Sequence, residues 1–135
     1  MNETAVATVG LYAVLNMAIL FWLVVATSQL RRRYKVWIGN GGVAHLERVM
    51  RGHANAIEHM PMTMLLLLIT ALLGTSVVAL HLLGVAFTAG RALHAWHFIE
   101  EKGARWQREI GFGLSGLATI VTMTTLLGHA FRLLL

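Results

Sequence analysis

The chain has 135 residues, of which 57% are hydrophobic and 13% charged, and its formal net charge is +5. Soluble domains carry about twice that charged fraction, so lipid rather than water is the expected surrounding of much of this chain. The absence of cysteine excludes disulfides, thiolate metal sites and a protein-borne thiol nucleophile.

The chain contains a series of long apolar runs. The first extends from about residue 5 to residue 30, and the second from about 45 to 73, with the only proline, Pro61. After a short turn at 74–76, a third run covers about 77–99 and a fourth about 106–134. Each exceeds the roughly 20 residues that a helix needs to cross a bilayer. Because open strands cannot span lipid, the sequence predicts an all-α membrane bundle of four helices, forming a single domain over residues 1–135.

The positive residues predict how the bundle lies in the membrane. They gather in two segments, 31–51 and 100–108, while the N-terminal residues and the turn near Gly74 carry none. Cytoplasmic loops of membrane proteins collect Lys and Arg. We therefore expect both basic segments on the cytoplasmic side and both termini on the outer side.

Polar side chains are predicted to lie inside the membrane. The apolar part of the second span, residues 60–73, covers only roughly 21 Å as a helix, whereas the hydrocarbon core is about 30 Å thick. Asn55 and Glu58, in the next two turns, should therefore lie partly at membrane depth. Arg91 and His94 follow the apolar part of the third span in the same way. Ionisable residues at such depth indicate a functional site by default.

An antiparallel pairing of the second and third spans about Gly74 brings these residues together. It places Glu58 at the level of Arg91, Asn55 at that of His94, and Arg51 at that of Phe98. Glu58 and Arg91 are predicted to form a structural ion pair that fixes helix register. At helical spacing, four polar residues of the second span share one face: Arg48, Arg51, Asn55 and Glu58. A cluster with this excess of positive charge predicts a site for an anionic ligand.

Several segments are similar to one known family. "ERVMRGHANAIEHMP", followed by a leucine run, resembles the second helix of the MAPEG family, the membrane-associated proteins in eicosanoid and glutathione metabolism. "QLRRRYK", "GRALHAWHF" and "RWQREIGFGL" resemble the end of the first helix, the third helix and the start of the fourth. The resemblance covers essentially the whole chain, and "NAIEHMP" is most similar to bacterial members. It implies a homotrimer that binds glutathione between neighbouring subunits.

The resemblance also assigns roles to individual positions. Arg108 resembles the arginine that stabilises the glutathione thiolate, with Arg105 as the alternative. Phe98 stands where several members have a tyrosine, so the hydrogen bond of that hydroxyl is not expected. Glu109 stands where one branch has serine, so serine-dependent chemistry is not expected. The positions implied to bind glutathione are Arg31 (reaching in from the adjacent subunit), Arg51, His53, Asn55, Glu58, His94, Phe98 and Arg105.

The resemblance implies a membrane-embedded glutathione transferase or peroxidase, acting in detoxification at a bacterial inner membrane with its site toward the cytoplasm. Glutathione would be the co-substrate, with neither metal nor nucleic acid involved. A cysteine thiol has a reference pKa of about 8.5, and a nearby guanidinium favours the nucleophilic thiolate. The electrophile would be a lipophilic molecule or a hydroperoxide from the bilayer.

Three other interpretations fit some of the same residues. A non-catalytic, lipid-binding member of the family would share the fold and the pocket. A small membrane transporter could use the buried charge cluster, although the charges lie toward one end of the spans. Paired histidines could also hold a haem iron, the candidates being His53, His59, His94 and His97.

Overall fold

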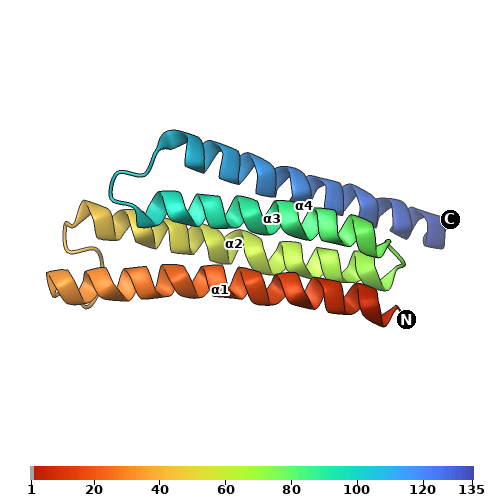
Figure 1. The fold of residues 1–135 in the computed structure, drawn as a ribbon, viewed down its shortest axis with the longest axis horizontal. Coiled ribbons are helices and arrows are strands. Elements are labelled where there is room, and N and C mark those ends of the chain that lie inside the picture. The colour runs from red at the N-terminus through yellow and green to blue at the C-terminus, as the bar shows by residue number, and fades with distance from the viewer. Residues whose placement is uncertain (1) are drawn as a thin grey trace.

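The computed structural model describes residues 2–135 and consists of four long helices that run alternately up and down (Figure 1). They are α1 (Glu3–Tyr34), α2 (Ala44–Leu72), α3 (Val77–Ile99) and α4 (Arg105–Leu134). All four are long and apolar enough to cross a membrane. The predicted all-α membrane bundle is therefore confirmed. Helix α1 continues through the arginines to Tyr34, and its C-cap, Lys35, adopts φ 55° in the left-handed region.

Short polar residues start two of the helices. Asn2 precedes α1 and accepts a hydrogen bond of 3.2 Å from the backbone N–H of Ala5, and Ser76 precedes α3 and accepts one of 3.3 Å from Ala79. Such N-caps satisfy a backbone donor that has no partner within the helix. Gly74 has φ 97°, which glycine adopts without strain, and it allows the tight turn between α2 and α3.

The two ends of the bundle differ in charge. Figure 1 shows both termini and the α2–α3 turn at one end, and the α1–α2 and α3–α4 loops at the other. The basic residues of segments 31–51 and 100–108 thus gather at the end with the two loops. Which side of a membrane this end faces stays a prediction.

The core lies between α1, α2 and α3. Its larger cluster contains Leu23, Leu46, Val49 and Phe87, each at most 2% exposed, and Ala118 of α4 joins it. Large apolar residues on the outer faces stay exposed in the single chain, as lipid-facing residues of a membrane bundle do; Val14 is 69% exposed.

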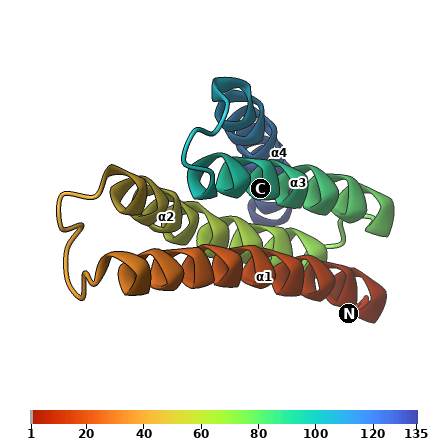
Figure 2. The ribbon, with the colours of Figure 1, turned by 60° about the vertical axis from the view of Figure 1, so that its left-hand side comes forward.

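Helix α4 packs on the opposite side of α3 from α1 (Figures 1 and 2). The two helices approach closely at glycines: a Cβ on Gly90 would lie 2.7 Å from the carbonyl oxygen of Gly111. Within residues 2–135, α4 also touches α2 but not α1. Because α4 follows α3 more closely than α2, space remains between α2 and α4 beside the α3–α4 loop.

Candidate functional site

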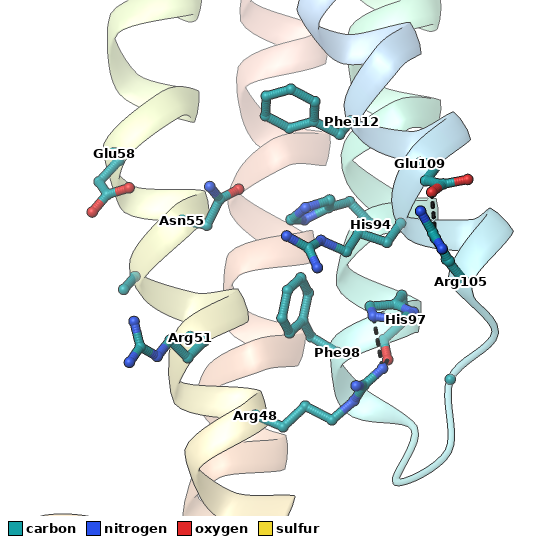
Figure 3. A pocket seen from close by; sticks show the side chains of 13 residues that line it. Arg48, Arg51, Asn55, Glu58, His94, His97, Phe98, Arg105, Glu109 and Phe112 are labelled. Carbon is teal, nitrogen blue, oxygen red and sulfur yellow. Dashed lines mark hydrogen bonds and ion pairs between the residues drawn. The ribbon is translucent and has the colours of Figure 1, made fainter.

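A pocket of about 810 Å³ occupies this space, at the end of the bundle that holds the basic loops (Figure 3). Helices α2 and α4 form its sides and the last turns of α3 its floor. Its volume falls in the range of small-molecule sites, roughly 300–1,000 Å³. The lining residues are Arg48, Arg51, Ala54, Asn55 and Glu58 of α2, His94, His97 and Phe98 of α3, Gly103 of the loop, and Arg105, Arg108, Glu109 and Phe112 of α4.

Most of the residues that the sequence singled out meet in this pocket. Those that line it are Arg51, Asn55, Glu58, His94, Phe98, Arg105 and Arg108. His53 belongs to α2 but does not line the pocket. Arg31 also lies outside it and donates hydrogen bonds to the carbonyl oxygens of Val36 and Gly39, at 3.2 and 3.0 Å. In this chain Arg31 therefore binds its own α1–α2 loop, and its reach into an adjacent subunit stays a prediction.

The pocket arginines differ in whether their charge is already engaged. Arg105 Nε donates to the carboxylate of Glu109 across 2.6 Å, and Arg51 lies 3.7 Å from the carboxylate of Glu47. Arg48 binds backbone carbonyls at the end of α3. Within the described residues 2–135, Arg108 makes neither a side-chain hydrogen bond nor an ion pair. Among the pocket arginines of the described residues, Arg108 has neither a hydrogen bond nor an ion pair, and Arg51 has only the 3.7 Å contact with Glu47.

The predicted ion pair between Glu58 and Arg91 is wrong. Arg91 is 1% exposed and donates across 3.0 Å to the amide oxygen of Asn55, and Glu58 is exposed. In Figure 3 Asn55 points toward His94, whereas Glu58, which also lines the pocket, lies farther from His94.

The helix register is not the cause of this error. A Cβ on Gly52 would lie 2.5 Å from the Cβ of Phe98, so Phe98 sits within one residue of its predicted level opposite Arg51. The long side chain of Arg91 instead reaches an amide one turn closer to the loops. Side-chain reach, which backbone periodicity does not report, decided the partner.

An aromatic wall, made of Phe98, His94 and Phe112, lines one side of the pocket. The ring centroid of His94 lies 5.0 Å from that of Phe98 and 6.2 Å from that of Phe112. His94 is 3% exposed, and its Nδ1 is buried with no hydrogen-bond partner among residues 2–135. The pocket therefore combines a basic polar rim with an apolar aromatic face.

Some lining residues were not predicted as site residues. Arg48 was placed on the polar face of the second span without a role, and its spacing from Arg51 was the available signal. Phe112 lies one turn beyond Arg108 on α4, so helical periodicity could have indicated it. His97 follows His94 by three residues on α3, so helical periodicity could have indicated it as well. Gly103 enters the pocket from the α3–α4 loop, for which the sequence offers no periodic signal.

Comparison with known proteins agrees with this architecture. Residues 9–128 match the MAPEG family model. The chain belongs to the MAPEG family. This MAPEG protein is also 34% identical over 99 residues to "Inner membrane protein YecN" of Escherichia coli (strain K12), an alignment that covers 73% of this chain and 75% of YecN. The YecN of Escherichia coli O6:H1 matches to the same extent. The family resemblance of the sequence is therefore confirmed, and the whole pocket lies within the matched range.

Proposed function

We propose that this MAPEG protein is a membrane-embedded glutathione transferase or peroxidase, which activates the glutathione thiol for attack on lipophilic electrophiles or hydroperoxides. The observation that carries the proposal is Arg108, an arginine without a partner within residues 2–135, on the wall of a basic pocket in a membrane bundle. A guanidinium beside a thiol favours the thiolate, which is the reactive form.

The charges of the pocket match those of glutathione, which has two carboxylates and one ammonium group. Arg51 offers a guanidinium for bidentate binding of a carboxylate, since its ionic neighbour Glu47 lies 3.7 Å away and both side chains are exposed. Glu58 is a lining carboxylate without an ion-pair partner in residues 2–135, and it suits the ammonium. The buried charge of Arg91 behind Asn55 adds to the positive potential at the floor.

The chemistry follows from the thiolate. In conjugation, its sulfur forms a bond to an electrophilic carbon and the leaving group departs with its electron pair. With a hydroperoxide, the sulfur attacks the terminal oxygen, the O–O bond breaks, and the alkoxide takes a proton to give an alcohol. The resulting sulfenic acid then reacts with a second glutathione, giving the disulfide and water. The two reactions need the same activated sulfur, so Arg108 serves either.

The aromatic wall provides the complementary apolar side. Phe112 is 50% exposed on α4, between the polar rim and the apolar helix surface. A lipophilic substrate entering from the bilayer would meet Phe112 first and then the sulfur. We place the protein in a bacterial inner membrane with the pocket toward the cytoplasm, supported by the basic loops beside the pocket and by the name of the YecN relatives.

The binding site is proposed to be completed in a homotrimer, in which Arg31 of one subunit reaches the glutathione held by its neighbour. The exposed apolar faces of the single chain leave room for such contacts as well as for lipid. Cross-linking of the detergent-purified protein tests this assembly. We expect the largest cross-linked species to contain three chains.

Calorimetry with glutathione on the purified protein tests the binding function. We expect wild type to bind and Arg51→Ala to bind about tenfold more weakly, because a charge-assisted contact is lost. Arg132→Ala, at the other end of the bundle, is the matched control and should bind like wild type. A folded wild-type sample that shows no binding at millimolar glutathione would overturn the proposal.

A further inference from the structure

The loop from Glu100 to Ala104, which joins α3 to α4, is fastened to α2 by an arginine. Arg48 Nε donates to the carbonyl oxygen of Glu100 across 3.0 Å, and its Nη2 donates to that of His97 across 2.6 Å. The last carbonyls of a helix have no partner within the helix. Arg48 supplies hydrogen-bond donors to these carbonyls from another helix, and so connects the end of α3 to the first turns of α2.

His97 extends this connection to α4. Arg48 Nη2 lies 2.7 Å from His97 Nε2, and His97 Nδ1 lies 2.8 Å from the carbonyl oxygen of Ala104. A guanidinium can only donate, so Nε2 must accept and the imidazole proton must sit on Nδ1, from which it is donated to Ala104. Ala104 is the residue that caps the N-terminus of α4. The neutral His97 therefore links Arg48 to the start of α4.

Gly103 of the α3–α4 loop packs closely against His97 and Arg48. A Cβ on Gly103 would clash with the carbonyl oxygen of His97 and would lie 2.8 Å from Arg48 Nη2. His97 is 6% exposed, so it is enclosed by the loop and the helices. Gly103 thus permits the close approach on which the two hydrogen bonds of His97 depend.

Arg108 lies one helical turn beyond Ala104, on the pocket wall. Within residues 2–135 its side chain has no partner of its own, so the placement of the first turn of α4 decides where its guanidinium can reach. We propose that Arg48 and His97 are positioning residues, which fix the α3–α4 loop to α2 and thereby hold Arg108 where it meets the glutathione thiol. The role toward the thiol rests on the proposed function, whereas the fixing of the loop does not.

Hydrogen exchange without glutathione tests the fixing of the loop. Arg48→Lys keeps the charge but cannot reach the three acceptors together, and His97→Phe keeps a ring but loses both hydrogen bonds. In each we expect the amides of the last turn of α3, residues 96–100, to exchange about tenfold faster or more. His97→Gln, whose side-chain oxygen can still accept from Arg48, should recover part of the protection. Arg32→Lys, an exposed site on α1, is the control and should exchange as wild type does.

The thiolate of bound glutathione tests the positioning of Arg108. Arg48 and His97 also line the pocket, so the readout is the difference between the effect on affinity and the effect on thiolate formation. In Arg48→Lys and His97→Phe we expect the pH midpoint of the thiolate absorbance to rise by about one unit, and the glutathione Kd to rise by clearly less than tenfold. Equal losses of affinity and thiolate would overturn the inference, because Arg48 would then bind the ligand directly. Unchanged exchange at 96–100 would overturn the fixing of the loop. A wild type that binds no glutathione would refute the proposed function and the role at the thiol, and the exchange result alone would then decide the loop.

Discussion

Arg91 donates a hydrogen bond of 3.0 Å to the amide oxygen of Asn55, and within residues 2–135 its guanidinium meets no carboxylate. Arg91 is 1% exposed, and its Nε finds no hydrogen-bond partner in that part of the chain. A cation removed from water without a counter-charge is costly, so such groups are retained where an anion or a partner binds. The buried charge directly behind Asn55 is therefore a second reason to expect an anionic ligand in the pocket.

The pairing of Arg91 with Asn55 makes a prediction about stability. Asn55→Ala removes the hydrogen-bond acceptor of a buried charge, and should lower the free energy of unfolding by about 1–3 kcal/mol. Glu58→Gln is the matched control on the same helix face, because Glu58 makes no ion pair with Arg91. It should change the free energy by no more than about 0.5 kcal/mol. Thermal unfolding in detergent compares the two variants. A larger loss of stability in Glu58→Gln than in Asn55→Ala would indicate that Arg91 pairs with Glu58 and would contradict the structure.

The close contact between α3 and α4 predicts that replacing different glycines by alanine will change the free energy of unfolding by different amounts. Gly90→Ala would place a methyl group 2.6 Å from the backbone nitrogen of Ser115 and 2.7 Å from the carbonyl oxygen of Gly111. Because these are backbone atoms of a packed helix, the helices must separate, at a cost of about 1–3 kcal/mol. In Gly113→Ala and Gly116→Ala the added methyl group has no atom of residues 2–135 within 4 Å outside its own helix turn, and a poor helix former is removed.

Those two control variants should be neutral or more stable by up to about 1 kcal/mol. Unfolding temperatures and glutathione affinity can be measured on the same samples. If Gly90→Ala were as stable as Gly113→Ala, the tight α3–α4 contact would be contradicted, and with it the placement of α4 beside the pocket.

Phe98 offers a way to add a contact rather than remove one. Its ring lines the pocket, and the Arg48 guanidinium carbon lies 5.6 Å from the ring centroid. Phe98→Tyr supplies a hydroxyl at the position where the family resemblance implies a tyrosine in several members. We expect glutathione to bind severalfold more tightly, as one new hydrogen bond contributes about 0.5–1.5 kcal/mol. Phe112→Tyr, at the apolar end of the aromatic wall, serves as the control; an equal gain there would mean that the hydroxyl acts nonspecifically.

The helices could be predicted from the sequence because membrane spans are encoded by length and hydropathy. The level of Phe98 opposite the Arg51–Gly52 turn also followed from the backbone, since two helices joined by the Gly74 turn have few possible registers. The partner of Arg91 did not follow, because a long side chain can reach more than one level of the neighbouring helix. Periodicity placed Glu58 and Asn55 on one face and could not choose between them.

The cluster of Arg48 and His97 could not be predicted from the sequence for a different reason. Its hydrogen bonds go to the carbonyl oxygens of His97, Glu100 and Ala104, and backbone carbonyls carry no mark in the sequence. The α3–α4 loop had to be built before the cluster could be recognised. Similarly, the sequence alone does not distinguish the arginines at positions 105 and 108. The structure distinguishes them because Glu109 forms an ion pair with Arg105.

The difference between Arg105 and Arg108 allows the most direct test of whether Arg108 activates the thiol. The measurement is the ultraviolet absorbance of the thiolate at saturating glutathione and neutral pH. Wild type, Arg105→Ala and Arg108→Ala are compared. We predict that wild type and Arg105→Ala show the thiolate, because the charge of Arg105 is already engaged by Glu109, and that Arg108→Ala loses it while still binding glutathione. An undiminished thiolate signal in Arg108→Ala would contradict the assignment of Arg108 as the residue that activates the thiol.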